Sequence, residues 1–556
     1  MLLFCNKYKI RILGDGNMYS QYIMVTPGSK VFGPYHEKRD CYEQLINFMK
    51  LHTHGKICAL YGLRRTGKTV MMEQCIAELP EEEKQKSAYL LCLNGCDMLE
   101  IRRVMEPLYE NGTRNFFIDE ITAVTDFQKY GNVLSDYFSA KGAKVIIAGT
   151  DSLGIMLAES DILYDRIQMI HTSHVPYAEF SRLLGGKTLD DYIEYGGTLT
   201  KSPYKTLQAS EEYQNTAIVG NILHSLEKSE DARRYGAALT ELYDHDELQS
   251  VLNKMINKFS YFVTVQAVNK YFKSAPLYST IHNIREPSYI SRINVEEANQ
   301  RTQDILGIKN QDEMDTSLSK QHIAELKDYL QGLDLFIKIP SYTSLQKGER
   351  VQDLEIFLQP GMIYAHATAL MQSLADNSVW MDSCGIDDRK AFLFRADRFV
   401  KGILLENIIL AETYRSFSQN DPKRFYVSQL STTLKENNQH VEADMILVDM
   451  QKNESYLFEI KYSNQIVEEQ TKHLRNEHFR QYVDENFGKV INRFVIYTGE
   501  SHCSTNEIPY LNAETYLNEL SQFSKPPYPK LEKLFFSEKV AQVKKVKKSS
   551  PKKPLL

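Results

Sequence analysis

The stretch that decides this fold is Gly62-Leu63-Arg64-Arg65-Thr66-Gly67-Lys68-Thr69, which fits the pattern G-x-x-x-x-G-K-[ST] in full. The apolar run at 56–61 predicts a buried strand before it, and residues 70–79 carry apolar side chains at helical spacing after it. A strand, a glycine-bounded loop and a helix are the context in which this pattern binds phosphate. The alternative is a glycine-containing strand-to-helix turn with a surface lysine.

The chemistry of this loop points to a nucleoside triphosphate. Backbone N–H groups of the loop and the positive end of the following helix would cradle the phosphates. Lys68 would reach the β- and γ-phosphates, and the Thr69 hydroxyl would ligate Mg²⁺. The sequence therefore predicts ATP and Mg²⁺ as cofactors.

Strands and helices alternate from residue 55 to about residue 175, which predicts a parallel sheet covered by helices on both faces. The predicted strands are 56–61, 87–93, 115–118, 144–148 and 167–171, and the predicted helices lie near 70–80, 97–110, 126–140 and 152–159.

An acidic pair, Asp119-Glu120, follows the apolar strand at 115–118. Asp119 would hold the Mg²⁺ shell, and Glu120 would orient and polarise the attacking water. A helix cap is the alternative, but a position about fifty residues past a phosphate loop favours the catalytic interpretation. The predicted nucleotide-binding residues are Gly62, Leu63, Arg64, Arg65, Thr66, Gly67, Lys68, Thr69, Val70 and Asp119.

Three further residues are candidates for sensing the γ-phosphate. Thr150 and Ser152 follow the strand at 144–148, where they could contact the nucleotide or cap the next helix. Arg166 precedes the strand at 167–171 and could act as an arginine finger in a homo-oligomer, or form a surface ion pair.

The C-terminal part carries a second group of candidate catalytic residues. Glu406 lies in a stretch of helical spacing, Asp444 begins a strand, and Glu459 and Lys461 share one face of the next strand. The three carboxylates could hold one Mg²⁺ or Mn²⁺ ion, and Lys461 could orient a water for attack on a phosphodiester. The alternative is a solvated strand face with an ion pair.

Composition limits the remaining possibilities. The chain has 556 residues and a net charge of −6, so any basic surface for nucleic acid must be local. Eight cysteines without a C-x-x-C pair indicate neither a zinc site nor a disulfide framework, which favours a reducing cytoplasm. No apolar run approaches membrane-spanning length, so we expect no membrane partner.

Patterning and composition predict the order of domains. We expect an N-terminal β-hairpin (1–30), the ATPase domain (31–180), a helical lid (181–255), a winged-helix-like module (256–345), a connecting segment (346–395), a nuclease-like domain (396–525) and a basic tail (526–556). A winged helix often binds DNA, but often serves only as a protein contact. The lysines of the tail could hold nucleic-acid phosphates, resemble a nuclear-targeting signal, or form a solvated end.

Together these motifs resemble a family of prokaryotic AAA-type P-loop ATPases that carry a C-terminal PD-(D/E)xK, restriction-endonuclease-like domain. The resemblance rests on 62–69, 117–120, 148–152 and 195–197 in the first half, and on 402–407, 442–444 and 458–461 in the second. It implies the winged-helix interpretation. In that family the arginine before the last ATPase strand usually follows glycine, whereas Arg166 follows Asp165.

Together these features predict a Mg²⁺-dependent ATPase whose nucleotide state controls a nuclease-like module that binds nucleic acid, DNA rather than RNA. One alternative is a signalling switch whose C-terminal domain is catalytically silent and only binds DNA or a partner. Another is a chaperone-like ATPase that acts on protein. The presence of Asp444, Glu459 and Lys461 together favours the nuclease over the switch.

Overall fold

The structure is a computed structural model. It describes residues 20–33, 36–51, 55–150, 154–155, 158, 162–199, 207–228, 236–274, 318–345, 348–377, 386–434, 438–503, 507–523, 528 and 531. These residues pack into two compact units. The first contains Cys41–Tyr61, Lys68–His171 and the described residues up to His36, and the second contains Glu37–Asp40, Gly62–Gly67 and the described residues from Thr172 onward.

The first unit is built on a six-stranded sheet with the order β1-β3-β4-β5-β2-β6, parallel except for the antiparallel edge strand β1. Its strands are β1 (Ile23–Pro27), β2 (Ile57–Tyr61), β3 (Ser87–Cys92), β4 (Asn115–Asp119), β5 (Lys144–Gly149) and β6 (Ile167–His171). Strand β5 lies between β2 and β4. The residues that follow β2, β4 and β5 therefore leave the sheet at one edge, because parallel strands share their direction.

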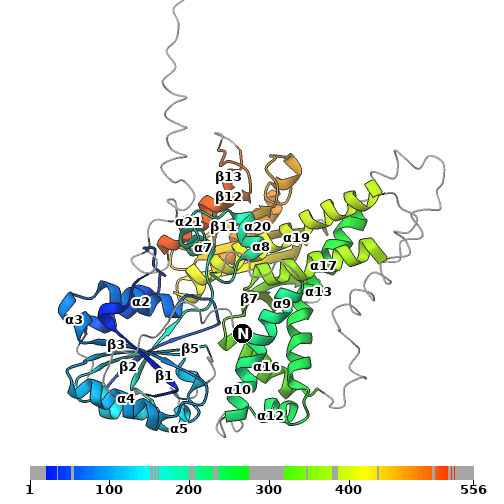
Figure 1. The fold of residues 1–556 in the computed structure, drawn as a ribbon. Helices are drawn as coiled ribbons and strands as arrows, with labels where there is room; N and C mark the ends of the chain where they lie inside the picture. Colours follow the sequence, from blue (N-terminus) through cyan, green and yellow to red (C-terminus); the bar gives the residue numbers. More distant parts are fainter. Residues whose placement is uncertain are drawn as a thin grey trace, which may run out of the picture. The chain divides into compact units, whose positions relative to one another are not determined.

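Helices cover both faces of this sheet (Figure 1). The helices are α1 (Tyr42–Lys50), α2 (Lys68–Glu78), α3 (Glu81–Gln85), α4 (Met98–Glu110) and α5 (Phe127–Tyr130), and a π-helical stretch spans Leu134–Ser139. Buried apolar side chains of α1 and α2 pack on one face, and those of α4 and the π-helical stretch pack on the other. A strand with a core on both faces needs apolar side chains on both faces, as β2 and the centre of β4, residues 116–118, have.

The predicted α/β class and parallel sheet are confirmed for this unit, with each strand boundary within about one residue of its predicted place. The return strand predicted within 1–30 is β1, which pairs with β3. The first strand of that hairpin lies outside the described residues, as do most of the helix at 152–159 and the lysine tail.

Helices occur along the whole described part of the second unit. They are α7 (Tyr177–Leu183), α8 (Leu189–Tyr195), α9 (Leu207–Tyr213), α10 (Gly220–Lys228), α12 (Ala237–Asp244), α13 (Leu248–Ser274), α16 (Lys320–Gly332), α17 (Pro360–Asn377), α19 (Ile386–Tyr414), α20 (Glu477–Phe487) and α21 (Ala513–Leu520). The Ser319 hydroxyl caps α16 by accepting from the backbone N–H of His322. Among the described helices, none combines the length and apolar character needed to cross a membrane.

A seven-stranded mixed sheet with the order β13-β12-β11-β10-β9-β7-β8 lies in the same unit. Its strands are β7 (Phe336–Leu345), β8 (Gly348–Phe357), β9 (Phe425–Thr433), β10 (His440–Asp449), β11 (Glu454–Lys461), β12 (Lys489–Tyr497) and β13 (Tyr510–Asn512). The strand predicted as a wing at 335–339 is β7. It pairs with β9 and so extends this sheet, and the predicted connecting segment supplies β8 and α17.

Glu412 of α19 is a carboxyl group inside the core of the second unit, with 5% of its surface exposed. One of its oxygens accepts a hydrogen bond from the backbone N–H of Tyr177 at 2.7 Å. Burial raises the pKa of Glu412 to about 8, although that hydrogen bond and Arg415 act to lower it. The folded protein therefore holds a proton on Glu412 that the unfolded chain, with an ordinary pKa of 4.5, releases.

Stability should fall as the pH rises from about 4.5 towards 8, because unfolding then releases this proton. The expected slope is about 1.4 kcal/mol per pH unit. Glu412→Gln keeps the acceptor for Tyr177 without the ionisation. Its melting temperature should exceed that of the wild type increasingly between pH 5.5 and 7.5. Melting curves at several pH values test this, and a constant difference between the two proteins would show that Glu412 does not titrate on unfolding.

Candidate functional site

Asp119 ends strand β4 and is 3% exposed. Its Oδ2 atom accepts two hydrogen bonds of 2.7 Å, one from the hydroxyl of Thr69 and one from the hydroxyl of Tyr89. Thr69 lies in the first turn of α2 and Tyr89 lies in β3, the strand beside β4. Hydroxyl and carboxylate oxygens are the ligands that Mg²⁺ prefers, so Thr69 and Asp119 fit a magnesium ion.

Glu120 follows directly and has a left-handed backbone with φ of 54°. Its backbone N–H donates to Asp119 Oδ1 at 2.9 Å, which fixes the second oxygen of that carboxylate. The Thr150 hydroxyl, at the end of β5, lies 3.4 Å from Glu120 Oε2. A left-handed conformation is strained for a residue with a side chain, and such strain concentrates at functional sites. Ser152 lies outside the described residues.

Lys68 is the first residue of α2 and is 6% exposed. One turn along the same helix, Glu73 lies close enough to Asp119 for their charges to interact. Burial and the charge of Asp119 together raise the pKa of Glu73 to about 7.

Arg166 forms an ion pair with Asp136 at 2.8 Å, with both side chains nearly half exposed. A surface ion pair was one of the two roles considered for Arg166, and the structure shows that ion pair. The finger role stays a prediction.

Tyr89→Phe should lower kcat for ATP hydrolysis about tenfold, since a hydrogen bond to a charged group contributes roughly 1.5 kcal/mol. The variant removes one of the two hydroxyl donors to Asp119 Oδ2 and keeps the ring in place. Steady-state ATPase assays test it. Tyr109→Phe is the matched control, because the Tyr109 hydroxyl donates to the Lys141 carbonyl on the surface. Equal rates for both variants would exclude a role for Tyr89 in orienting Asp119.

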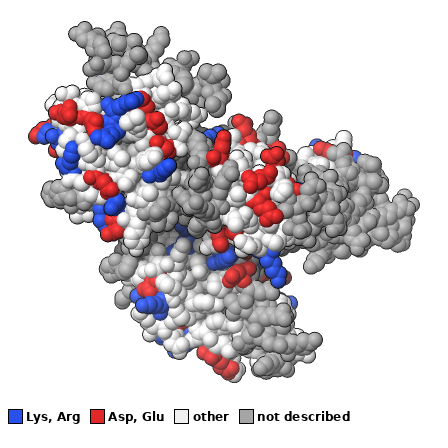
Figure 2. Space-filling model, turned by 90° about the horizontal axis from the view of Figure 1, so that it is seen from below, with Lys and Arg blue, Asp and Glu red and all other residues white. Residues whose placement is uncertain are grey.

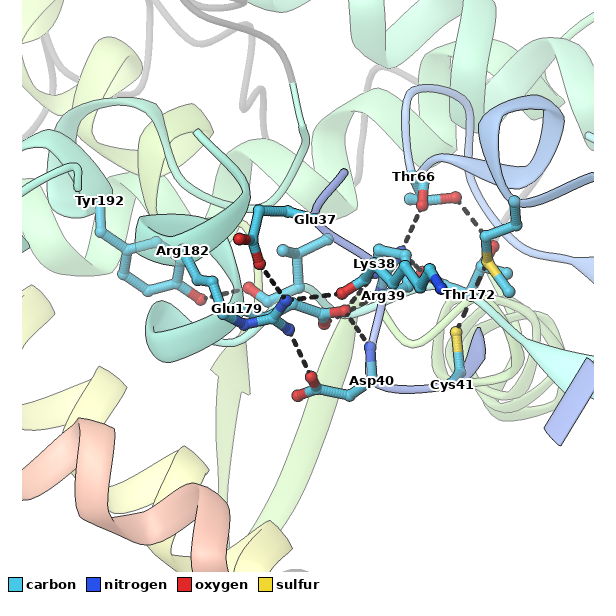
Figure 3. A network of polar contacts seen from close by, with 12 residues as sticks. Glu37, Lys38, Arg39, Asp40, Cys41, Thr66, Thr172, Glu179, Arg182 and Tyr192 are labelled. Atoms are coloured by element: carbon cyan, nitrogen blue, oxygen red, sulfur yellow. Dashed lines mark hydrogen bonds and ion pairs between the residues drawn. The ribbon is translucent and has the colours of Figure 1, made fainter. Parts of the chain in front are cut away.

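The loop Gly62–Gly67 belongs to the second unit, where residues after β6 hold it. The Leu63 N–H donates to the Ser173 hydroxyl at 2.8 Å. The hydroxyls of Thr66 and Thr172, both labelled in Figure 3, lie 2.8 Å apart. Gly62 has φ of +137°, and a Cβ atom there would lie 2.6 Å from Ser173 Oγ. Only glycine fits this position, as the motif requires.

Three of the four C-terminal candidates, Asp444, Glu459 and Lys461, meet at the end of the β10–β11 hairpin. The Lys461 ammonium lies 2.8 Å from Asp444 Oδ2 and 2.6 Å from Glu459 Oε2. Asp444 Oδ2 also accepts from the backbone N–H of Ile460 at 2.7 Å. Glu459 and Lys461 thus share one face of the strand, as the alternation of side chains predicts. We call Asp444, Glu459 and Lys461 the hairpin cluster.

Electrostatics within the hairpin cluster keep the lysine charged. Burial acts to lower the pKa of Lys461, but Asp444 and Glu459 outweigh it and raise that pKa above its ordinary value. Burial and the charge of Asp444 raise the pKa of Glu459.

Glu406 lies in α19, which packs against β9 and β11. Within the described part of the chain, no three or more His, Cys, Asp or Glu side chains are grouped so that they could hold a metal ion, and Glu406, Asp444 and Glu459 are among those described. The metal-binding role of these three residues stays a prediction.

Helix α8 supplies acidic side chains to the residues next to the hairpin cluster. The hydroxyl of Tyr462, which follows Lys461, donates to Asp190 Oδ1 at 2.6 Å. Glu194, one turn along α8, pairs with Lys401 of α19 at 2.7 Å. The hairpin cluster therefore lies beside a contact between α8, α19 and the end of β11.

The sequence motifs did not predict a role for Tyr89 or Glu73, or for the residues that hold the loop. Tyr89 is a tyrosine in a mostly apolar strand, β3, which neighbours the strand that ends in Asp119. This pattern could have indicated a polar contact between the two residues. No such signal existed for Thr172 and Ser173, because they contact residues more than one hundred positions earlier.

Two family models match parts of the chain. Residues 54–181 match the model of an AAA domain, and residues 401–516 match that of a domain of unknown function (DUF4143). No curated protein matches the chain. The first match contains the phosphate loop, Asp119 and Glu120, and the second contains Glu406 and the hairpin cluster.

Proposed function

We propose that the AAA domain at residues 54–181 binds and hydrolyses ATP with Mg²⁺, and that its nucleotide state controls the C-terminal domain, which is nuclease-like and binds nucleic acid. The observation that carries the ATPase part is the hydrogen bond between Thr69 and Asp119. It joins the last residue of the phosphate loop to the first residue of the acidic pair, which are fifty positions apart in the chain.

Each residue of the site would have a separate role in ATP hydrolysis. Thr69 and Asp119 would hold Mg²⁺, which when bound neutralises charge on the β- and γ-phosphates. Lys68 would bind the phosphates directly, and Glu120 would accept a hydrogen bond from the attacking water and orient it. Thr150, next to the Glu120 carboxylate, would keep that carboxylate in position.

The hairpin cluster supports the nuclease-like part. A lysine beside two carboxylates, with Asp444 on β10 and the other two at the end of β11, is an arrangement that could orient water near a phosphodiester. If a divalent metal binds, Asp444 and Glu459 would supply oxygen ligands after release from Lys461. Hard oxygen ligands suit Mg²⁺ or Mn²⁺.

The distribution of charge bears on the nucleic-acid partner. On the face seen in Figure 2, the described Lys and Arg side chains lie in small groups among acidic ones. Broad basic surfaces dominate nonspecific nucleic-acid binding. Contact through this face would therefore involve few phosphates, and we expect its affinity to fall only modestly as the salt concentration rises.

A signalling switch with a silent C-terminal domain is the second candidate. The observation that favours it is the ion pairing of Lys461 with both carboxylates, which gives each carboxylate a cationic partner without metal. Partner or DNA binding by that domain would need no cleavage chemistry.

A nuclease assay separates the two candidates. The full chain is incubated with single- and double-stranded DNA and RNA, with Mg²⁺ or Mn²⁺, and with or without ATP. Cleavage that depends on metal supports the nuclease-like function. Absence of cleavage under every condition, with ATP hydrolysis intact, would favour the switch.

A further inference from the structure

We infer that Arg39 and Tyr213 are positioning residues of the phosphate loop, which they orient by donating to its backbone carbonyls from outside. The inference rests on the proposed ATPase function. Both residues lie in the second unit with the loop, and both lie outside the two stretches that match family models.

Arg39 is held rigidly by Glu179 of α7. Its Nε donates to Glu179 Oε1 at 2.6 Å and its Nη2 donates to Glu179 Oε2 at 3.1 Å, a paired geometry that fixes the plane of the guanidinium (Figure 3). Both side chains are almost fully buried, with 6% and 3% exposed. Burying a charged pair costs free energy, which is offset only when the geometry is good and the remaining donors are satisfied.

The remaining arm of the guanidinium faces the loop. Arg39 Nη1 donates to the carbonyl of Thr66 and, at 2.9 Å, to the carbonyl of Thr172. The same group therefore binds the loop and the segment that follows β6.

Thr66 is not the only loop residue whose carbonyl is bound. The Tyr213 hydroxyl donates to the Arg64 carbonyl at 3.0 Å, and the Leu199 N–H donates to the Arg65 carbonyl at 2.9 Å. Three consecutive loop carbonyls, those of residues 64, 65 and 66, thus have donors from three separate segments of the second unit.

The geometry of the peptide bond connects these contacts to phosphate binding. In a trans peptide the C=O and the following N–H point in opposite directions. A donor that holds the Thr66 carbonyl therefore turns the Gly67 N–H to the opposite side, and Tyr213 does the same for the Arg65 N–H. Phosphate loops bind their ligand through such N–H groups, so the outer donors set their direction before ATP arrives.

Two substitutions test the inference. Tyr213→Phe removes only the hydroxyl, and Arg39→Lys keeps a positive charge for Glu179 but loses the planar fork. Each should weaken ATP binding about tenfold, the effect of losing one oriented hydrogen bond, and raise KM more than it lowers kcat. Binding is measured by titrating the full chain with ATP and Mg²⁺, and KM by steady-state hydrolysis.

Tyr329→Phe is the matched control. Tyr329 is a buried tyrosine whose hydroxyl donates to the carbonyl of Ile218 at 2.8 Å, outside the loop. The Tyr329→Phe variant should bind ATP with the affinity of the wild type.

The melting temperature of each variant shows how much protein is folded in the assay. Weaker binding by folded Tyr213→Phe or Arg39→Lys protein, with Tyr329→Phe unchanged, is the expected result. Wild-type affinity in both loop variants, or a loss that follows only the folded fraction, would overturn the inference. Failure of the wild type itself to bind ATP would instead overturn the proposed function.

Discussion

Lys68→Ala is expected to abolish ATP turnover, with a loss of roughly 10³-fold or more, equivalent to about 4 kcal/mol of transition-state stabilisation. Lys68 is the first residue of α2, and its ammonium group is the side-chain cation that the motif directs at the β- and γ-phosphates. No neutral side chain can replace that charge where the transferred phosphoryl group becomes most negative. Steady-state phosphate release from the full chain measures the effect.

Lys86→Ala is the control for this experiment. Lys86 is an exposed lysine of the same unit and pairs with Glu82 at 2.6 Å. Its loss should leave hydrolysis unchanged, because exposed ion pairs contribute little to stability. If Lys68→Ala retained hydrolysis while folding normally, the assignment of 62–69 as the phosphate loop would be wrong.

The second large effect is expected at the hairpin cluster. Replacing Asp444 and Lys461 together by alanine should abolish cleavage that depends on Mg²⁺ or Mn²⁺, while ATP turnover continues at the wild-type rate. The double change removes a metal ligand and the cation that would orient the water. Glu459 also loses its Lys461 partner, but burial raises the pKa of that carboxyl and so favours its neutral form. Gel analysis of nucleic-acid products, run beside an ATPase assay, measures both activities.

Lys452 and Glu454 provide a control with the same change of charge. They form a looser pair of 3.8 Å at the other end of the β10–β11 hairpin. Their double alanine variant should cleave as the wild type does. If the Asp444/Lys461 variant cleaved as well as the Lys452/Glu454 variant, the nuclease activity would come from another part of the chain or from a contaminant.

The first unit could be predicted well because its signals are local. Five apolar runs, each followed by a glycine or polar residues, mark the parallel strands, and the helix after the loop has an apolar period of its own. Asp119 and Thr69 could be expected to meet, since β4 and the loop after β2 end at the same edge of one sheet.

The second unit could be predicted less well. Strand β8 has the sequence Gly-Glu-Arg-Val-Gln-Asp-Leu-Glu-Ile-Phe, in which four of the ten side chains are charged, and it resembles a connecting segment. It is the edge strand of the seven-stranded sheet, and edge strands carry charge that discourages pairing with other chains. The parallel pairing of β7 with β9 joins residues about ninety positions apart, and no local pattern encodes such a pairing.

Arg39 and Glu179 illustrate the same limit at the site. Each is an ordinary charged residue in the sequence, and 140 positions separate them. Only the fold reveals that they are buried together and that their remaining donor binds the phosphate loop.

The outer donors of the loop also bear on how this protein can be divided for study. The AAA match covers 54–181, but the donors to the loop carbonyls come from residues 39, 199 and 213. A fragment cut at the limits of that match would keep every residue of the nucleotide motif and lose all three donors. The smallest piece that retains a preorganised nucleotide site therefore extends at least from Arg39 to Tyr213, and recombinant fragments should be designed on that span.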